Sequence, residues 1–147
     1  MKPTRREFLS HAAALAGASV IIPSHAFAKT KVAANERITV AGIGLGPRGR
    51  KLLQWFLPQP DIHFVAIADV QKERREIIRR MVNRHYGNED CVTYSDMQDI
   101  LGREDIDAVI IATSDRWHGT ASIWAANAGK DIYCEKPCAM SIEESAQ

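Results

Sequence analysis

Residues 37–49, which read RITVAGIGLGPRG, decide the fold of this chain. Residues 37–43 suit a buried strand, and a helix is expected over residues 48–57, before Pro58. Between them lies a GxGxxG turn, whose glycines allow a tight bend, a close backbone approach to a ligand, and close packing of helix on strand. Free N–H groups at the start of such a helix attract anions, so the turn predicts a dinucleotide-phosphate site. Its residues, all expected to bind the cofactor, are Gly44, Leu45, Gly46, Pro47, Arg48 and Gly49.

An acidic residue follows the second predicted strand, residues 62–68. Asp69 lies about 20 residues beyond the turn, the spacing at which a Rossmann domain holds the adenosine ribose. Its carboxylate can accept hydrogen bonds from both ribose hydroxyls and would repel a 2′-phosphate, which favours NAD. Lys72, Arg74 and Arg75 follow closely and could instead hold that phosphate, so NADP remains the less favoured alternative.

The rest of the chain alternates short apolar runs with helical ones. Further strands are expected at residues 91–94, 107–112 and 131–134, and helices at 71–86, 96–101 and 119–128. Ser95 is the predicted cap of the helix at 96–101, and Ser141 opens a last helix. Five strands separated by helices predict an α/β, Rossmann-type doubly wound parallel sheet in the order 3-2-1-4-5. We expect this NAD(P)-binding domain to span residues 37–147 and to be truncated at its C-terminal end.

Composition excludes several classes of partner and site. The 147 residues are 46% hydrophobic, which suits one domain with a core. The formal charge is +1, and it becomes −1 without residues 1–28, which hold three cationic residues and one acidic residue. This balance gives no case for nucleic-acid binding. Three irregularly spaced cysteines and scattered histidines predict neither a disulfide framework nor a metal site.

The N-terminus has the features of an export signal. Arg5 and Arg6 precede Phe8-Leu9 in a pattern that resembles a twin-arginine (Tat) signal, and residues 12–22 are almost all small or apolar. That run is too short to span a membrane, so no stable membrane anchor is expected. Ala26-Phe27-Ala28 fits a signal-peptidase site after Ala28. We expect a Tat signal peptide at 1–28, a linker at 29–36, and export by the Tat machinery to a periplasmic or extracellular location.

Two later motifs carry a family resemblance. Ala112-Thr113-Ser114-Asp115-Arg116-Trp117-His118 follows the fourth strand, and Glu135-Lys136-Pro137 follows the fifth. With the glycine turn, they resemble the glucose–fructose oxidoreductase and inositol dehydrogenase family (Gfo/Idh/MocA) over essentially all of the chain after residue 36. Ser114 departs from the proline that many members have there.

The resemblance implies a role for each motif residue. Backbone around Thr113 and Ser114 would line the cofactor's path, and Trp117 and His118 would lie near the nicotinamide ribose. Lys136 would be the catalytic residue, reaching the nicotinamide and the substrate hydroxyl. Glu135 would position Lys136 or the cofactor, and Pro137 would follow a cis peptide bond.

The same resemblance implies NAD(P)-dependent hydride transfer on a sugar, a polyol or a derivative, with a C-terminal substrate domain absent from this chain. The complete protein is expected to form a homo-oligomer, and this fragment alone to be inactive. One alternative is an NAD-dependent glycosidase, in which a transient oxidation permits elimination of the glycosidic bond before the hydride returns. Another is a non-catalytic NAD-sensing module, against which the Glu135-Lys136 pair argues.

Overall fold

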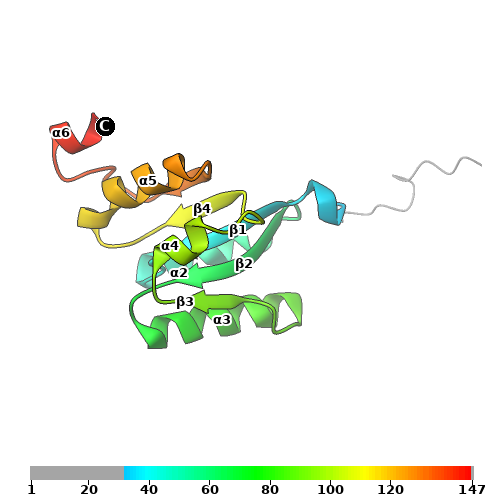
Figure 1. Cartoon of the computed structure of the whole chain (residues 1–147). Coiled ribbons are helices and arrows are strands. Elements are labelled where there is room, and N and C mark those ends of the chain that lie inside the picture. Colours follow the sequence, from blue (N-terminus) through cyan, green and yellow to red (C-terminus); the bar gives the residue numbers. More distant parts are fainter. Residues whose placement is uncertain (1–31, 147) are drawn as a thin grey trace, which may run out of the picture. The chain divides into compact units, whose positions relative to one another are not determined.

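A five-stranded parallel sheet forms the centre of the domain (Figure 1). The computed structural model describes residues 32–146. The strands are β1 (Ile38–Ile43), β2 (Ile62–Ala68), β3 (Val92–Tyr94), β4 (Ala108–Ile111) and β5 (Asp131–Cys134). Their order is β3-β2-β1-β4-β5, and each neighbouring pair is parallel. This confirms the predicted doubly wound sheet and its strand order.

Helices cover both faces of the sheet. The first two, α2 (Pro47–Phe56) and α3 (Lys72–Tyr86), pack on one face with Leu52, Leu53, Ile78 and Val82 in the core. The next two, α4 (Met97–Leu101) and α5 (His118–Asn127), close the other face. A short α6 (Ile142–Ser145) follows β5, and 3-10 turns lie at η2 (Ala34–Glu36) and η3 (Asp115–Trp117). Two apolar layers therefore bury most of β1, β2 and β4, as their near-continuous apolar sequences predict, whereas the edge strands β3 and β5 stay half-buried or exposed.

The carboxyl ends of the strands meet at one edge of the sheet. Backbone bonds continue past the strands, from Gly44 N to Ala68 O and from Ala112 N to Ile43 O. Asp69 N donates to Tyr94 O, and Glu135 N donates to Ile111 O. These bonds bring the glycine turn, Asp69 and the two later motifs to the same edge, where open α/β sheets bind ligands.

Local differences from the sequence predictions occur at helix starts. The prediction that Ser95 caps α4 was wrong, because the helix begins one residue later and Asp96 is its N-cap, accepting from Gln98 N at 2.9 Å. The η3 turn before α5 was not predicted. Within the predicted linker, Ala34–Glu36 forms the η2 turn, and the predicted signal peptide at 1–28 lies outside the described residues.

Candidate cofactor-binding site

The glycine turn has the geometry that its motif requires. Gly44 has a φ of +69°, and a Cβ there would lie 2.7 Å from the Cα of Thr113, so glycine is needed for both conformation and space. A Cβ on Gly49 would lie 2.8 Å from a methyl carbon of Leu45 and 3.2 Å from Ala112, which shows how closely α2 packs on the sheet. At Gly46 the nearest atom would be a guanidinium nitrogen of Arg74, at 3.5 Å. At Gly46 the turn therefore lies against a basic side chain with room for ordinary van der Waals contact.

The start of α2 lacks a capping side chain. Gly46 is the N-cap, Pro47 occupies the first turn, no side chain accepts a hydrogen bond from that turn, and no acidic residue lies in it. The first N–H groups of a helix have no partner within the helix, and they carry the positive end of its dipole. The turn therefore presents donors and positive potential without an internal anion to occupy them.

Asp69 has a buried carboxylate oxygen that no other described group satisfies. The residue is 6% exposed at the end of β2. Its Oδ1 accepts from Gln71 N at 2.8 Å, while its Oδ2 is buried without a hydrogen-bond partner. A buried carboxylate oxygen without a donor is costly, and a native site normally supplies one. Hydroxyl groups of a ribose are donors of the kind that this oxygen lacks.

A cavity of about 770 Å³ runs along this edge of the sheet. It contains most of the predicted cofactor residues, and it is also lined by residues 95–98, which span the end of the β3–α4 connection and the start of α4 and which the sequence reasoning missed. Trp124 of α5 is a further unpredicted lining residue. The predicted residues that line the cavity are Gly44, Gly46, Pro47, Arg48, Asp69, Thr113, Ser114 and Trp117.

The remaining predicted site residues lie outside the cavity lining. Leu45 is 1% exposed in the core, and Gly49 is buried against it. His118, Glu135 and Lys136 do not line the cavity either, although Glu135 and Lys136 follow β5 at the same sheet edge. The Lys136–Pro137 peptide bond is cis, as predicted.

An ion pair connects two motifs that are 87 residues apart. Arg48 Nε donates to Glu135 Oε1 at 2.7 Å, and its guanidinium lies 5.3 Å from the centre of the Trp55 ring. Glu135 is 6% exposed, and its other oxygen accepts from Lys136 N at 3.2 Å. The hydrogen bond from Arg48 lowers the pKa of the Glu135 carboxyl, so Glu135 is an anion at neutral pH. Only the opposite charges of the two motifs could have suggested this contact from sequence.

His118 anchors the segment that follows Lys136. Its side chain is buried at the start of α5, with Nδ1 2.7 Å from Pro137 O. Because a carbonyl can only accept, Nδ1 donates this hydrogen bond, and Nε2 is buried without a hydrogen-bond partner among the described residues. The contact with Pro137 places His118 beneath the lysine segment, away from the cavity wall.

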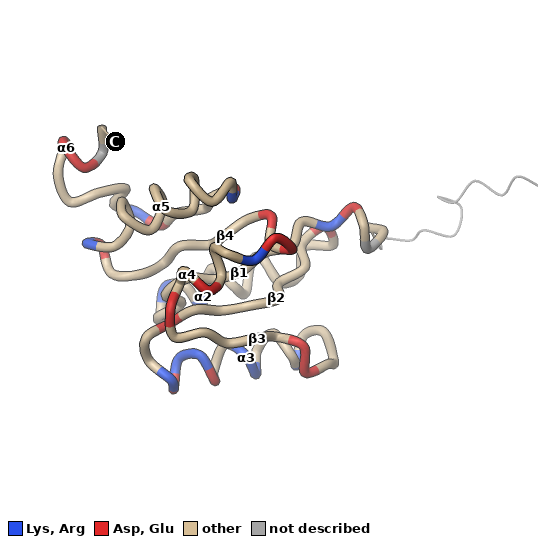
Figure 2. Tube along the Cα trace, in the orientation of Figure 1, with Lys and Arg blue, Asp and Glu red and all other residues tan. Residues whose placement is uncertain are grey.

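The basic residues after Asp69 occupy different positions, although several cationic residues gather along α3 (Figure 2). Arg74 lines the cavity beside Gly46. Arg75 Nη1 donates to the backbone carbonyl of Asp69 at 2.5 Å, and Lys72 is exposed outside the lining. Of the three candidates for a 2′-phosphate contact, Arg74 is therefore the one whose side chain lines the cavity.

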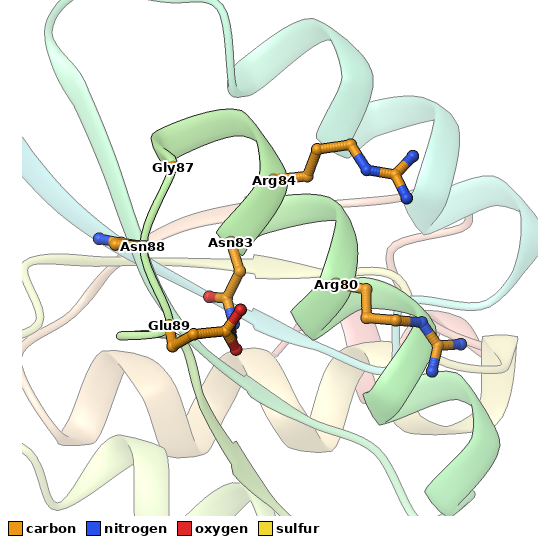
Figure 3. A pocket seen from close by; sticks show the side chains of 6 residues that line it. All are labelled: Arg80, Asn83, Arg84, Gly87, Asn88 and Glu89. Atoms are coloured by element: carbon orange, nitrogen blue, oxygen red, sulfur yellow. Dashed lines mark hydrogen bonds between the residues drawn. The ribbon is translucent and has the colours of Figure 1, made fainter.

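A second hollow lies at the C-terminal end of α3, where hydrogen bonds join several of its residues (Figure 3). Asn83 Nδ2 donates to Glu89 at 2.9 Å, and Asn83 Oδ1 accepts from Cys91 N at 3.1 Å. Arg80 and Arg84 extend away from these groups (Figure 3). The buried asparagine closes the loop between α3 and β3, which is a structural role.

Across residues 32–146, no three His, Cys, Asp or Glu side chains are grouped so that they could hold a metal ion. In the same part of the chain no helix has the length and apolar character needed to cross a bilayer.

The parallel sheet, the uncapped glycine turn and the unsatisfied Asp69 oxygen define a dinucleotide-binding domain, and these groups fit NAD or NADP. A family model described as "Oxidoreductase family, NAD-binding Rossmann fold" matches residues 37–147. The chain belongs to this family, the Gfo/Idh/MocA oxidoreductases.

Curated relatives carry the name glycosyl hydrolase family 109. One from Porphyromonas gingivalis is 33% identical over 113 residues, covering 74% of this chain and 24% of the relative. Another, from Stenotrophomonas maltophilia, is 30% identical over 146 residues, covering 95% of this chain and 31% of the relative. The chain thus spans 24–31% of the length of these relatives.

Solved structures of dehydrogenases share the fold. Myo-inositol 2-dehydrogenase from Lactobacillus plantarum is 27% identical with a TM-score of 0.66, covering 75% of this chain and 31% of that one. Myo-inositol dehydrogenase from Lactobacillus casei, in complex with NAD(H) and myo-inositol, is 26% identical with a TM-score of 0.65, covering 75% and 31%. A putative NADPH-dependent oxidoreductase from Desulfitobacterium hafniense is 26% identical with a TM-score of 0.67, covering 76% and 30%.

Proposed function

We propose that this chain is the NAD-binding domain of an exported enzyme that transfers hydride to and from a carbohydrate. The observation that carries the proposal is the match of residues 37–147 to the family, together with a buried Asp69 oxygen that lacks a donor. In this proposal the Asp69 carboxylate binds the adenosine ribose, and the uncapped start of α2 binds the pyrophosphate.

NAD is the proposed cofactor. The Asp69 carboxylate would face a 2′-phosphate with like charge in a buried setting, where repulsion is weakly screened. Arg74 is the available counter-charge, since Arg75 is held by the Asp69 carbonyl. A single arginine beside a buried carboxylate favours NAD, and it leaves NADP as a weaker ligand.

Lys136 is the proposed proton-transfer residue. It follows β5 at the sheet edge that carries the cavity, and its backbone N–H is held by Glu135. Bound NAD would supply a hydride acceptor for a substrate carbon that bears a hydroxyl group. Lys136 would take the hydroxyl proton as that carbon becomes a ketone.

Glycoside cleavage is the proposed net outcome, because the curated relatives are named glycosyl hydrolase family 109. The new ketone acidifies the neighbouring C–H, whose proton is lost as the glycosidic C–O bond breaks and the leaving group is protonated. Water would then add at the former glycosidic carbon, and the ketone would be reduced back to the alcohol. The cycle consumes water and no net NAD.

The experiment that separates these outcomes measures two products of the complete protein. A panel of chromogenic aryl glycosides and a panel of free polyols, inositols included, are each incubated with NAD. Release of the aryl alcohol without accumulation of NADH supports the glycosidase. Stoichiometric NADH from a polyol would identify a net dehydrogenase instead, and no turnover on either panel would favour an NAD-sensing module.

The role of Lys136 is tested in the same assay. Lys136→Ala should lower kcat by about 10²–10⁴, the usual range for loss of a proton-transfer group, with little change in NAD affinity. Lys51→Ala, an exposed lysine on α2, is the control and should retain wild-type turnover. Near-normal kcat in Lys136→Ala would refute the assignment.

Export by the Tat route is the third part of the proposal. It rests on Arg5, Arg6 and the apolar run at 12–22, and the alignment with the Stenotrophomonas maltophilia relative covers 95% of the chain, so it extends into this segment. Replacing both arginines with lysine should retain the protein in the cytoplasm, and the exported wild type should begin at or near Lys29 by mass spectrometry. Unchanged export of the variant would refute the Tat assignment.

A further inference from the structure

The backbone of Lys136 is held on both sides by groups from other parts of the sequence. On the N-terminal side, the Glu135 carboxylate accepts both Arg48 Nε, at 2.7 Å, and the Lys136 N–H, at 3.2 Å. On the C-terminal side, His118 Nδ1 is bonded to Pro137 O at 2.7 Å. The lysine therefore lies between two fixed points, one joined to the glycine turn and the other to the start of α5.

Arg48 and Glu135 are not equivalent partners. The Arg48 side chain is half-exposed and lines the cavity, whereas the Glu135 side chain is buried and does not. The buried carboxylate needs its two donors, because an unpaired buried charge is strongly destabilising. The interaction thus ties the end of β5 to the first turn of α2.

We propose that Arg48 and Glu135 act together as a positioning pair that fixes Lys136 for hydride and proton transfer, with His118 anchoring the other side of the lysine. This inference rests on the proposed role of Lys136. In this role Glu135 does not bind the cofactor itself. It positions Lys136 by accepting hydrogen bonds from Arg48 and from the Lys136 backbone N–H. Small displacements of a reacting group slow a reaction far more than they weaken binding, so the effect belongs in kcat.

The test is a double-mutant cycle in the complete protein, measured at saturating NAD. Arg48→Ala and Glu135→Ala should each lower kcat about tenfold, and the double variant should lose no more than either one, because residues in one unit are non-additive. The NAD dissociation constant of Glu135→Ala should change less than about threefold, since its side chain does not line the cavity. Arg50→Ala, two residues further along the same helix, is the matched control and should keep the wild-type kcat.

Conservative variants separate positioning from folding. Glu135→Gln keeps the side-chain volume and an acceptor for one donor, so it should recover part of the kcat lost in Glu135→Ala while keeping the wild-type melting temperature. The Arg48→Ala protein could fail to fold, because it leaves the buried Glu135 carboxylate without its arginine. In that case the kcat of Glu135→Gln is compared with those of wild type and Glu135→Ala instead. A wild-type kcat in Glu135→Ala, or losses that multiply in the double variant, would overturn the proposal.

Hydrogen exchange tests the same pair without any turnover. Peptides that cover residues 134–139 should exchange faster in Arg48→Ala and Glu135→Ala than in wild type and Arg50→Ala, because the Lys136 N–H loses its acceptor or that acceptor's anchor. Equal exchange in all four proteins would overturn the positioning pair. If wild type transfers no hydride while the exchange rates differ as expected, the proposed function is wrong, but Arg48 and Glu135 still hold the backbone of Lys136.

Discussion

Replacing Asp69 with alanine removes the buried carboxylate that the cavity leaves half-satisfied. In the free protein Oδ1 already accepts from Gln71 N, so Oδ2 is the oxygen with unused capacity. A hydrogen bond to a charged group contributes about 1.5–3 kcal/mol. Its loss in Asp69→Ala should raise the dissociation constant for NAD about 10- to 150-fold. The free energy of unfolding should change much less, because the substitution removes one hydrogen bond together with an unfavourable unpaired oxygen.

The assay is titration of NAD and of NADP by calorimetry, with the melting temperature as a check on folding. Asp69→Ala should weaken NAD and narrow its advantage over NADP, since the repulsion of a 2′-phosphate disappears while Arg74 remains. Asp69→Asn, which keeps the shape without the charge, should fall between wild type and Asp69→Ala for NAD. Asp99→Asn on α4, outside the cavity lining, is the control. An NAD dissociation constant within about threefold of wild type in Asp69→Ala, or a wild-type preference for NADP, would refute the reasoning.

Three further predictions concern the domain itself. Gly44→Ala should destabilise the domain by about 2–5 kcal/mol in chemical denaturation, because the new Cβ would meet Thr113 and the φ is positive. Gly129 also has a positive φ but no neighbouring atom within 4 Å, so Gly129→Ala should destabilise the domain by only about 1–2 kcal/mol. Equal losses of stability would contradict the close approach of Thr113 to Gly44. Burial raises the pKa of the Cys91 thiol to about 12, so exposed Cys138 should be alkylated before Cys91 at pH 8. The free energy of unfolding should fall between about pH 9 and pH 12, because the unfolded thiol loses its proton first, and Cys91→Ala should reduce this slope. Rapid labelling of Cys91 in the folded protein would contradict this prediction. ADP should compete with NAD with a dissociation constant within about tenfold of that for NAD, because the cavity is lined by the residues assigned to the adenosine and pyrophosphate; failure to compete would place the binding energy elsewhere.

The sheet order was predictable because apolar strands, glycine turns and short connections leave few topologies. The β2 and β5 strands were predicted with their observed bounds, and the boundaries of the other predicted strands and helices moved by one residue, as helix ends do when caps compete. Ser95 and Asp96 show the reason, since both residue types can cap and only the three-dimensional start of α4 selects the carboxylate.

The site was predictable where a motif is local, and it was not where it depends on contacts distant in sequence. Gly44 and Asp69 act through the backbone conformation and strand end that carry them, and both can be read from spacing. The pairing of Arg48 with Glu135 spans 87 residues, and the burial of His118 depends on how α5 packs on the sheet. Sequence patterns specify neither the distance nor the partner in such cases.

The two ends of the site differ in what they need from a ligand. At Asp69 and the start of α2, donors and an acceptor are left without internal partners, so a ligand there gains the hydrogen bonds that the free protein lacks. Around Lys136 the opposite holds, because the Glu135 carboxylate and His118 Nδ1 are already bonded within the domain. A group whose supports are complete before binding requires little reorganisation when a reaction begins, which is the condition for electrostatic and positional catalysis. The adenosine end is therefore suited to supply affinity and the lysine end to supply rate, so substitutions at Asp69 should act on dissociation constants and substitutions around Lys136 on kcat.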